Sequence, residues 1–119
     1  MRIMIVDDSR AMRMIVARTL KQSGHTGEVR EAADGAEALA AIKADRPDLV
    51  LSDWNMPEMN GIELLGALRA EGIDVPFGFV TSESTAEMRE QAIHGGALFL
   101  IAKPFTADDF ESALAGVAA

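Results

Sequence analysis

The chain has 119 residues, a formal net charge of −8 and no cysteine. This length suits one domain that buries a core without cross-links, and the lack of cysteine excludes disulfides and thiolate metal sites. The acidic balance argues against direct nucleic-acid binding, which needs clustered lysine and arginine, so we expect a protein partner. We also expect a cytoplasmic protein with no membrane insertion, because neither a signal-peptide pattern nor a run of membrane-spanning length is present.

Short apolar runs alternate with helical patterns along the chain. Residues 3–6 form the first expected strand, and Ser9 can cap a helix that ends near Gly24. A weaker strand is expected at 28–32, where polar residues at alternate positions are typical of a sheet edge. An Ala-rich helix follows it, and Asp34 can cap the start of this helix.

Three further strands are expected at 47–51, 75–80 and 98–101. Ser84 predicts the start of the helix after the fourth strand, and Thr106 predicts the start of the last helix. The apolar positions expected to face the core in the last three helices are Ile62, Leu65, Leu68, Met88, Ala92, Ile93, Phe110, Ala113, Leu114 and Val117.

The alternation of five strands with five helices predicts an α/β fold over 1–119, with one parallel sheet, right-handed crossovers and helices on both faces. In such sheets ligands bind at the edge formed by the carboxyl ends of the strands. Polar residues that stand just past those ends are therefore expected to share one cleft. They are Asp7, Asp8, Asp53, Thr81 and Lys103.

Three carboxylates in one cleft need a cation, because two like charges ~4 Å apart repel by about 4 kcal/mol at an effective dielectric of about 20. Only oxygen ligands are on offer, so a hard ion such as Mg²⁺ suits them. The set predicts phosphoryl transfer to a carboxylate, with Asp53 as first candidate, Lys103 balancing charge and Thr81 donating a hydrogen bond. Each residue alone is as easily explained as a loop acid, a strand end or a solvated charge.

The motifs in combination resemble the receiver domain of two-component response regulators, most closely the stand-alone chemotaxis type, over essentially the whole chain. The resemblance implies the flavodoxin-like strand order 2-1-3-4-5. No effector domain or linker follows the fifth expected helix, so we expect no output domain in residues 1–119 and signalling by docking, unless the chain is a fragment of a longer protein. The motifs that carry the resemblance are Asp7-Asp8, the run Asp53-Trp54-Asn55-Met56-Pro57 with Met59 and Gly61, Thr81, and Lys103-Pro104-Phe105.

This resemblance implies a role for each residue of the cleft. Asp53 would accept the phosphoryl group from the phosphohistidine of a sensor histidine kinase or a histidine phosphotransfer protein. Lys103 would contact that group, and Thr81 would bond to it and switch; the peptide bond between Lys103 and Pro104 is expected to be cis. The ligands implied for Mg²⁺, or for Mn²⁺ in its place, are Asp7, Asp8, Asp53 and the backbone carbonyl of Asn55.

Loop residues beside the cleft are expected to contact the phosphoryl group and to control its hydrolysis. Trp54, Asn55 and Ser82 are the expected contacts, and Trp54 is interpreted as a partly exposed lid or as simple packing. By resemblance, Asn55 and Glu83 are expected to tune water access, so the protein would catalyse its own dephosphorylation. We expect a signalling protein that catalyses only these reactions on itself.

One residue departs from the family pattern. Leu100 stands where receivers usually carry tyrosine or phenylalanine, whose ring turns inward when the switch threonine moves. Phe99 cannot replace that ring, because neighbouring residues on a strand point to opposite faces. We therefore expect no ring switch, and we expect sensing mainly through Thr81 to Glu83 and the following helix, with a smaller change on the fifth strand.

Family analogy suggests a monomer whose downstream protein target docks on the fourth helix, fifth strand and fifth helix. Candidate targets are a flagellar motor switch protein, a kinase or a phosphorelay transfer protein. Two alternatives remain open. One is a phosphate-independent interaction module. The other is a phosphatase of the haloacid dehalogenase type, against which the adjacent acids Asp7 and Asp8 and the lack of room for a cap domain both argue.

Overall fold

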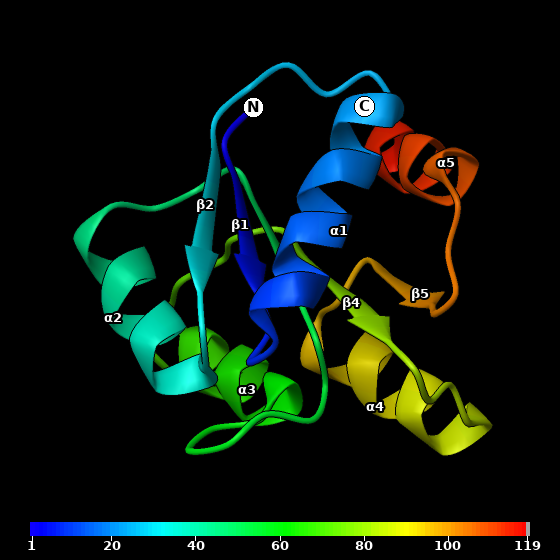
Figure 1. The fold of residues 1–119 in the computed structure, drawn as a ribbon. Coiled ribbons are helices and arrows are strands. Elements are labelled where there is room, and N and C mark those ends of the chain that lie inside the picture. Colours follow the sequence, from blue (N-terminus) through cyan, green and yellow to red (C-terminus); the bar gives the residue numbers. More distant parts are fainter. Residues whose placement is uncertain (119) are drawn as a thin grey trace.

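A computed structural model describes residues 1–118 as one parallel sheet between two layers of helices (Figure 1). The strand order β2-β1-β3-β4-β5 confirms the flavodoxin-like fold expected from the sequence. No helix within this described part is both long and apolar enough to cross a membrane. The elements are β1 Ile3–Val6, α1 Arg10–Gln22, β2 Val29–Ala32, α2 Gly35–Ala44, β3 Leu49–Ser52, α3 Gly61–Ala70, β4 Phe77–Thr81, α4 Ala86–Gly95, β5 Phe99–Ala102 and α5 Ala107–Ala118.

The core has two halves, one on each face of the sheet. Helices α2, α3 and α4 cover one face, and α1 and α5 cover the other. Along β1, Met4 and Val6 pack into the first half while Ile3 and Ile5 pack into the second. A central strand that is buried on both faces is expected to be largely apolar, which explains the continuous apolar run of β1.

Helix starts agree with the sequence in all but one of the expected cases. The side chains of Ser9 and Asp34 accept hydrogen bonds from backbone N–H groups three residues on, and so cap α1 and α2. Thr106 does the same for α5. The cap expected at Ser84 is wrong, because Thr85 caps α4. Two adjacent hydroxyl residues offer the same chemistry, so composition alone does not choose between them.

The inner face of α4 is the main difference from the expected core. Leu65 and Leu68 of α3 are fully buried as expected, and Leu64 joins them. Ile93, expected inside, is 71% exposed. Ala92 is the buried residue of α4 and Met88 packs against the core partly buried, as expected, so the helix faces the sheet through these two and leaves Ile93 in solvent.

Candidate functional site

The candidate site lies at the carboxyl edge of the sheet, toward which the arrowheads in Figure 1 point. Hydrogen bonding between strands continues one residue past their ends. The N–H of Asp7 donates to a carbonyl of β2 at 3.1 Å, that of Asp53 to β1 at 2.8 Å, and that of Lys103 to β4 at 2.8 Å. These bonds bring residues from distant parts of the sequence to one edge.

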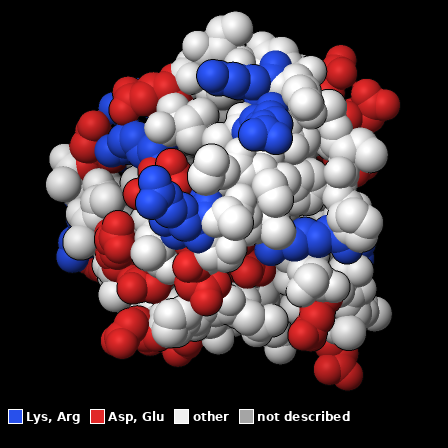
Figure 2. Space-filling model, in the orientation of Figure 1, with Lys and Arg blue, Asp and Glu red and all other residues white. Residues whose placement is uncertain are grey.

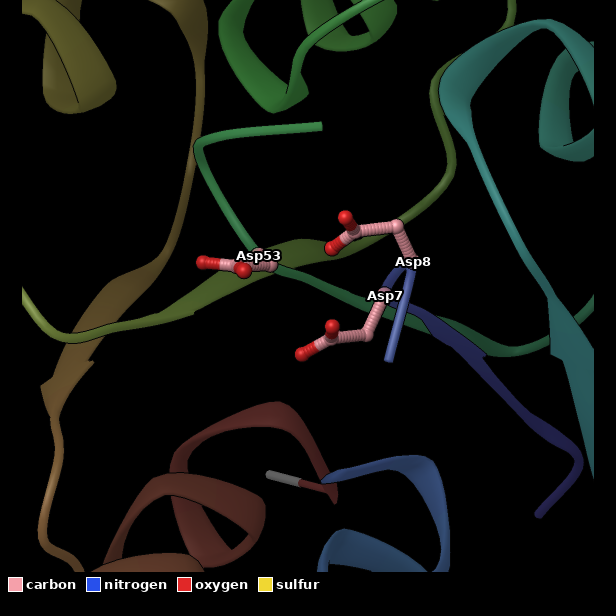
Figure 3. A group of neighbouring side chains, drawn as sticks. All are labelled: Asp7, Asp8 and Asp53. Carbon is pink, nitrogen blue, oxygen red and sulfur yellow. The ribbon is translucent and has the colours of Figure 1, made fainter. Parts of the chain in front are cut away.

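The three carboxylates expected to share a cleft do lie together. Asp7, Asp8 and Asp53 each offer an oxygen atom within 4.8 Å of the others. Figure 3 shows their side chains projecting the same way from the loops that follow β1 and β3. The Nζ of Lys103 lies 3.3 Å from Asp7 Oδ2 and 3.6 Å from Asp53 Oδ2, so one ammonium group contacts two of the three acids.

The electrostatics of this cluster favour an added cation. Burial raises the pKa of the Asp53 carboxyl above its ordinary value; the Lys103 ammonium opposes this rise, and the Asp7 carboxylate adds to it. Three acids against one lysine leave negative charge in excess. The donors are all carboxylate oxygens, which is the ligand type that Mg²⁺ prefers, so the residues present fit this ion. Asp7, Asp8 and Asp53 are the side chains that could hold it.

The backbone around Asp53 is fixed by the start of α3. The N–H of Trp54 donates to Asp53 Oδ1 at 2.8 Å. The N–H of Gly61 donates to the Trp54 carbonyl at 2.8 Å. A β-carbon at Gly61 would overlap the carbonyl oxygen of Asp53, so only glycine allows this close approach. These contacts tie the backbone around the candidate phosphoacceptor to the start of α3.

Trp54 is not the partly exposed lid considered from the sequence. It is 7% exposed, and its ring lies 4.8 Å from that of Phe79. The lid interpretation is wrong and the packing alternative is confirmed, because the Trp54 side chain turns into the core and packs against Phe79 of β4. The contact of Trp54 with the site is made by its backbone N–H group.

The other loop residues flank the cleft. Thr81 is fully buried, and its hydroxyl accepts a hydrogen bond of 3.3 Å from the N–H of Glu83. The side chains of Asn55, Ser82 and Glu83 are exposed to solvent. Their expected contacts with a phosphoryl group remain predictions. Among the described residues, no hydrogen bond joins the Thr81 hydroxyl to the three acids. The peptide bond between Lys103 and Pro104 is cis.

Leu100 and Phe99 point to opposite faces of the sheet, as expected. Leu100 packs against the core half under α2, α3 and α4, whereas Phe99 packs against the half under α1 and α5. The Phe99 ring occupies the space where a side chain at Gly78 would lie. This packing ties Phe99 to the opposite face, so it cannot supply the ring that Leu100 lacks.

Arg13 contacts the site and was missed by the sequence reasoning. Its Nη1 donates to the carbonyl oxygen of Asp7 at 2.7 Å, and its Nε donates to Glu31 Oε1 at 2.8 Å. The only signal in the sequence is an arginine one turn into the helix that follows the two acids. Its partner on β2 depends on how α1 lies across the sheet, which local patterns do not reveal.

The chain is similar to known proteins over nearly its full length. A family model described as "Response regulator receiver domain" matches residues 3–115. Response regulator MprA of Mycobacterium ulcerans is 38% identical over 108 residues, which cover 91% of this chain and 46% of that protein. The MprA of Mycobacterium avium is also 38% identical, over 92% of this chain and 47% of its own length. The chain thus spans about half the length of these curated relatives.

Solved structures give the same picture. Chemotaxis protein CheY4 of Vibrio cholerae superposes with a TM-score of 0.86 at 36% identity, covering 98% of this chain and 97% of that one. The signal receiver domain of the putative response regulator NarL from Mycobacterium tuberculosis superposes with a TM-score of 0.88 at 32% identity, covering 98% and 94%. Both similarities extend over the strand ends that carry the acidic cluster.

Proposed function

From the premise that the chain belongs to the response regulator receiver domain family, we propose that Asp53 accepts a phosphoryl group in a Mg²⁺-dependent reaction. The donor is the phosphohistidine of a sensor histidine kinase or of a histidine phosphotransfer protein. One observation carries the proposal: Asp53 lies with Asp7 and Asp8 in an oxygen cluster that spans 4.8 Å, and Lys103 contacts two of the three acids.

The transfer requires only positioning and charge balance. A carboxylate oxygen of Asp53 forms a bond to phosphorus while the bond from phosphorus to the histidine nitrogen breaks, and the released imidazole keeps the electron pair and takes up a proton. Lys103 balances charge on the phosphoryl oxygens, and the Thr81 hydroxyl donates to one of them. When bound, the metal ion neutralises charge on the same oxygens. The proposed ligands are the three acids and the backbone carbonyl of Asn55.

Hydrolysis of the aspartyl phosphate then returns the protein to its unphosphorylated state. Asn55 and Glu83 stand on the two loops beside the cleft, and both side chains are exposed and able to orient a water molecule. We therefore assign the control of this step to these two residues. Before hydrolysis, movement of Thr81 toward the phosphoryl group carries the signal into the loop at 81–84 and into α4.

The proposed output is binding of a downstream protein in the cytoplasm to the face made by α4, β5 and α5. Two cavities of about 260 and 430 Å³ lie on this face, and Arg89, Phe99 and Leu100 line both of them. Leu98, which is 58% exposed, adds apolar surface beside the first. Such a surface suits a partner that inserts apolar side chains.

Two kinds of output have support from the comparisons. A stand-alone regulator of the chemotaxis type is favoured by the match to almost all of CheY4. A receiver within a longer regulator is favoured by the curated relatives, which are about twice as long. A pull-down with and without a beryllofluoride phosphate mimic separates these candidates. A stand-alone regulator requires a target protein that the isolated chain captures in the presence of the mimic and does not capture in its absence.

The test of the proposed function is covalent labelling. Incubation with acetyl phosphate and Mg²⁺ should add one phosphoryl group to the wild type, seen by intact mass, and none to Asp53→Asn. Asp34→Asn is the matched control, because asparagine also caps a helix and Asp34 opens α2. Equal labelling of wild type and Asp53→Asn would refute the assignment. No labelling of the wild type would instead favour a phosphate-independent module.

A further inference from the structure

The side chain of Arg13 links the acidic cluster to the edge strand β2. Arg13 belongs to α1, a helix with basic residues and no acidic one, on the face of the protein turned to the viewer in Figures 1 and 2. We infer that Arg13 is a positioning residue that holds the carboxylate of Asp8 in place for a divalent cation. This inference rests on the proposed metal site and adds a residue that acts on it without touching the ion.

The guanidinium group of Arg13 makes two hydrogen bonds, one to the backbone before Asp8 and one to β2. It donates from Nη1 to the Asp7 carbonyl oxygen at 2.7 Å and from Nε to Glu31 Oε1 at 2.8 Å. The Arg13 side chain is 15% exposed and that of Glu31 is 45% exposed, so the bond to the Asp7 carbonyl is the better shielded of the two from competing water. Arginine is suited to this task because its planar group donates in two set directions at once. Glu31 anchors the group, and the anchored group holds the Asp7 carbonyl.

Holding that carbonyl also orients Asp8. The peptide unit from Asp7 to Asp8 is planar, so a fixed oxygen atom fixes the direction in which the chain enters Asp8. Asp7 has further supports: its Oδ1 accepts from the N–H of Ser9 at 2.9 Å, and its Oδ2 contacts Lys103. Within residues 1–118, no hydrogen bond or ion pair holds the Asp8 carboxylate itself. The placement of the Asp8 carboxylate beside the other two acids therefore depends on the backbone that Arg13 holds by its hydrogen bond to the Asp7 carbonyl.

Positioning and charge make opposite predictions for the removal of Arg13. If its positive charge were all that mattered, its loss would strengthen the binding of a cation to the acids. If Arg13 holds Asp8, its loss weakens binding, because outer partners that orient metal ligands typically contribute roughly 10- to 100-fold in affinity. The sign of the change thus separates the two roles.

The experiment is a Mg²⁺ titration monitored by the fluorescence of Trp54, the single tryptophan, whose backbone N–H donates to Asp53 Oδ1. Arg13→Met removes the guanidinium group and its hydrogen bonds but keeps an unbranched apolar side chain in the helix. Its Kd for Mg²⁺ should rise about tenfold. Lys21→Met, in the last turn of α1, removes the same charge about 12 Å further along the helix axis and should leave the Kd unchanged.

Thermal melts separate the failure of this inference from that of the proposed site. If Mg²⁺ changes neither the fluorescence nor the melting midpoint of the wild type, the proposed metal site itself is wrong. A wild type that binds Mg²⁺ together with an Arg13→Met variant of equal or lower Kd would overturn the role of Arg13 alone. If Arg13→Met fails to fold in EDTA, the same Mg²⁺ titration is done with Glu31→Ala in about 0.5 M salt, which screens the change in charge. The Kd of Glu31→Ala for Mg²⁺ should be higher than that of the wild type. An unchanged Kd would overturn the inference.

Discussion

Helices α3 and α4 lie side by side on one face of the sheet and have ten residues each, yet they are held in different ways. Helix α3 buries Leu64, Leu65 and Leu68 completely, and Gly61 at its start packs on the backbone of Asp53. Helix α4 buries only Ala92 and leaves Ile93 in solvent. Helix α3 contributes three fully buried leucines to the core, whereas α4 contributes a buried alanine and a partly buried methionine, Met88.

This difference assigns separate tasks to the two helices. The loop before α3 carries Asp53, so the well-packed helix supports the residue that we propose as the phosphoacceptor. The loop before α4 begins at Thr81 and includes Glu83, so the helix with few buried contacts follows the residues proposed to move. Segments with little buried apolar surface open at low free-energy cost. In the proposed function, the chemistry thus lies beside the well-packed helix and the response beside the loosely packed one.

The largest expected effect comes from truncating one apolar side chain in each helix. Leu68→Ala should lower the free energy of unfolding by about 2–5 kcal/mol, because it leaves a cavity at a fully buried position. Ile93→Ala should change it by less than about 0.5 kcal/mol, because that side chain already lies in solvent. Urea unfolding measures both values. Similar losses for the two variants would show that α4 is as well packed as α3.

The sequence predicts the buried face of α3 correctly and that of α4 only in part, for a physical reason: Met88 and Ala92 face the core as expected, but Ile93 does not. Strands buried on both faces have continuous apolar runs, so the sequence shows which polar residue ends each run. The strand ends alone are enough to predict the site residues Asp7, Asp53, Thr81 and Lys103. Ile93 was misplaced because periodicity reveals an apolar stripe but not whether the sheet reaches it. Arg13 could not be found, since its bonds depend on how α1 crosses β2.

The next largest effect concerns two glycines. Gly96 caps α4 with φ of 99°, and its carbonyl accepts a hydrogen bond of 3.3 Å from Arg69 of α3. Gly96→Ala should cost about 1 kcal/mol of stability, because a side chain is strained in this left-handed conformation. Gly66 lies inside α3 with open space around it, so Gly66→Ala should add about 0.5–1 kcal/mol. Thermal melts test the pair, and a stabilised Gly96→Ala would show that α4 is not held at its end.

A smaller effect is expected on the lifetime of the phosphoryl group. Asn55 belongs to the loop before α3 and Glu83 to the loop before α4, so each helix contributes one exposed polar residue beside the cleft. Replacing both with leucine should lengthen the lifetime about threefold or more, which corresponds to roughly 0.7 kcal/mol of barrier, because neither can then orient a water molecule. Loss of label over time measures it. An unchanged lifetime in the double variant would remove these residues from the hydrolytic step.

The smallest expected change is on β5, and it tests the comparison most directly. Leu100 has no ring to turn and no hydroxyl to expose, and Phe99 is packed on the opposite face of the sheet. Addition of beryllofluoride and Mg²⁺ should therefore shift the amide resonances of 81–84 and of α4 strongly. Those of β5 should shift little. Helix α3 serves as the internal reference, since its buried leucines should hold it still.

Leu100→Tyr sharpens this last prediction. A tyrosine supplies the ring and hydroxyl that leucine lacks, so the same phosphate mimic should shift the β5 amides more in the variant than in the wild type. The response at 81–84 should be kept, because it starts from the Thr81 hydroxyl. The opposite pattern in the wild type, with the largest shifts centred on Leu100 while 81–84 stays still, would mean that the strand senses phosphorylation without a ring. The loose packing of α4 would then have no part in the response.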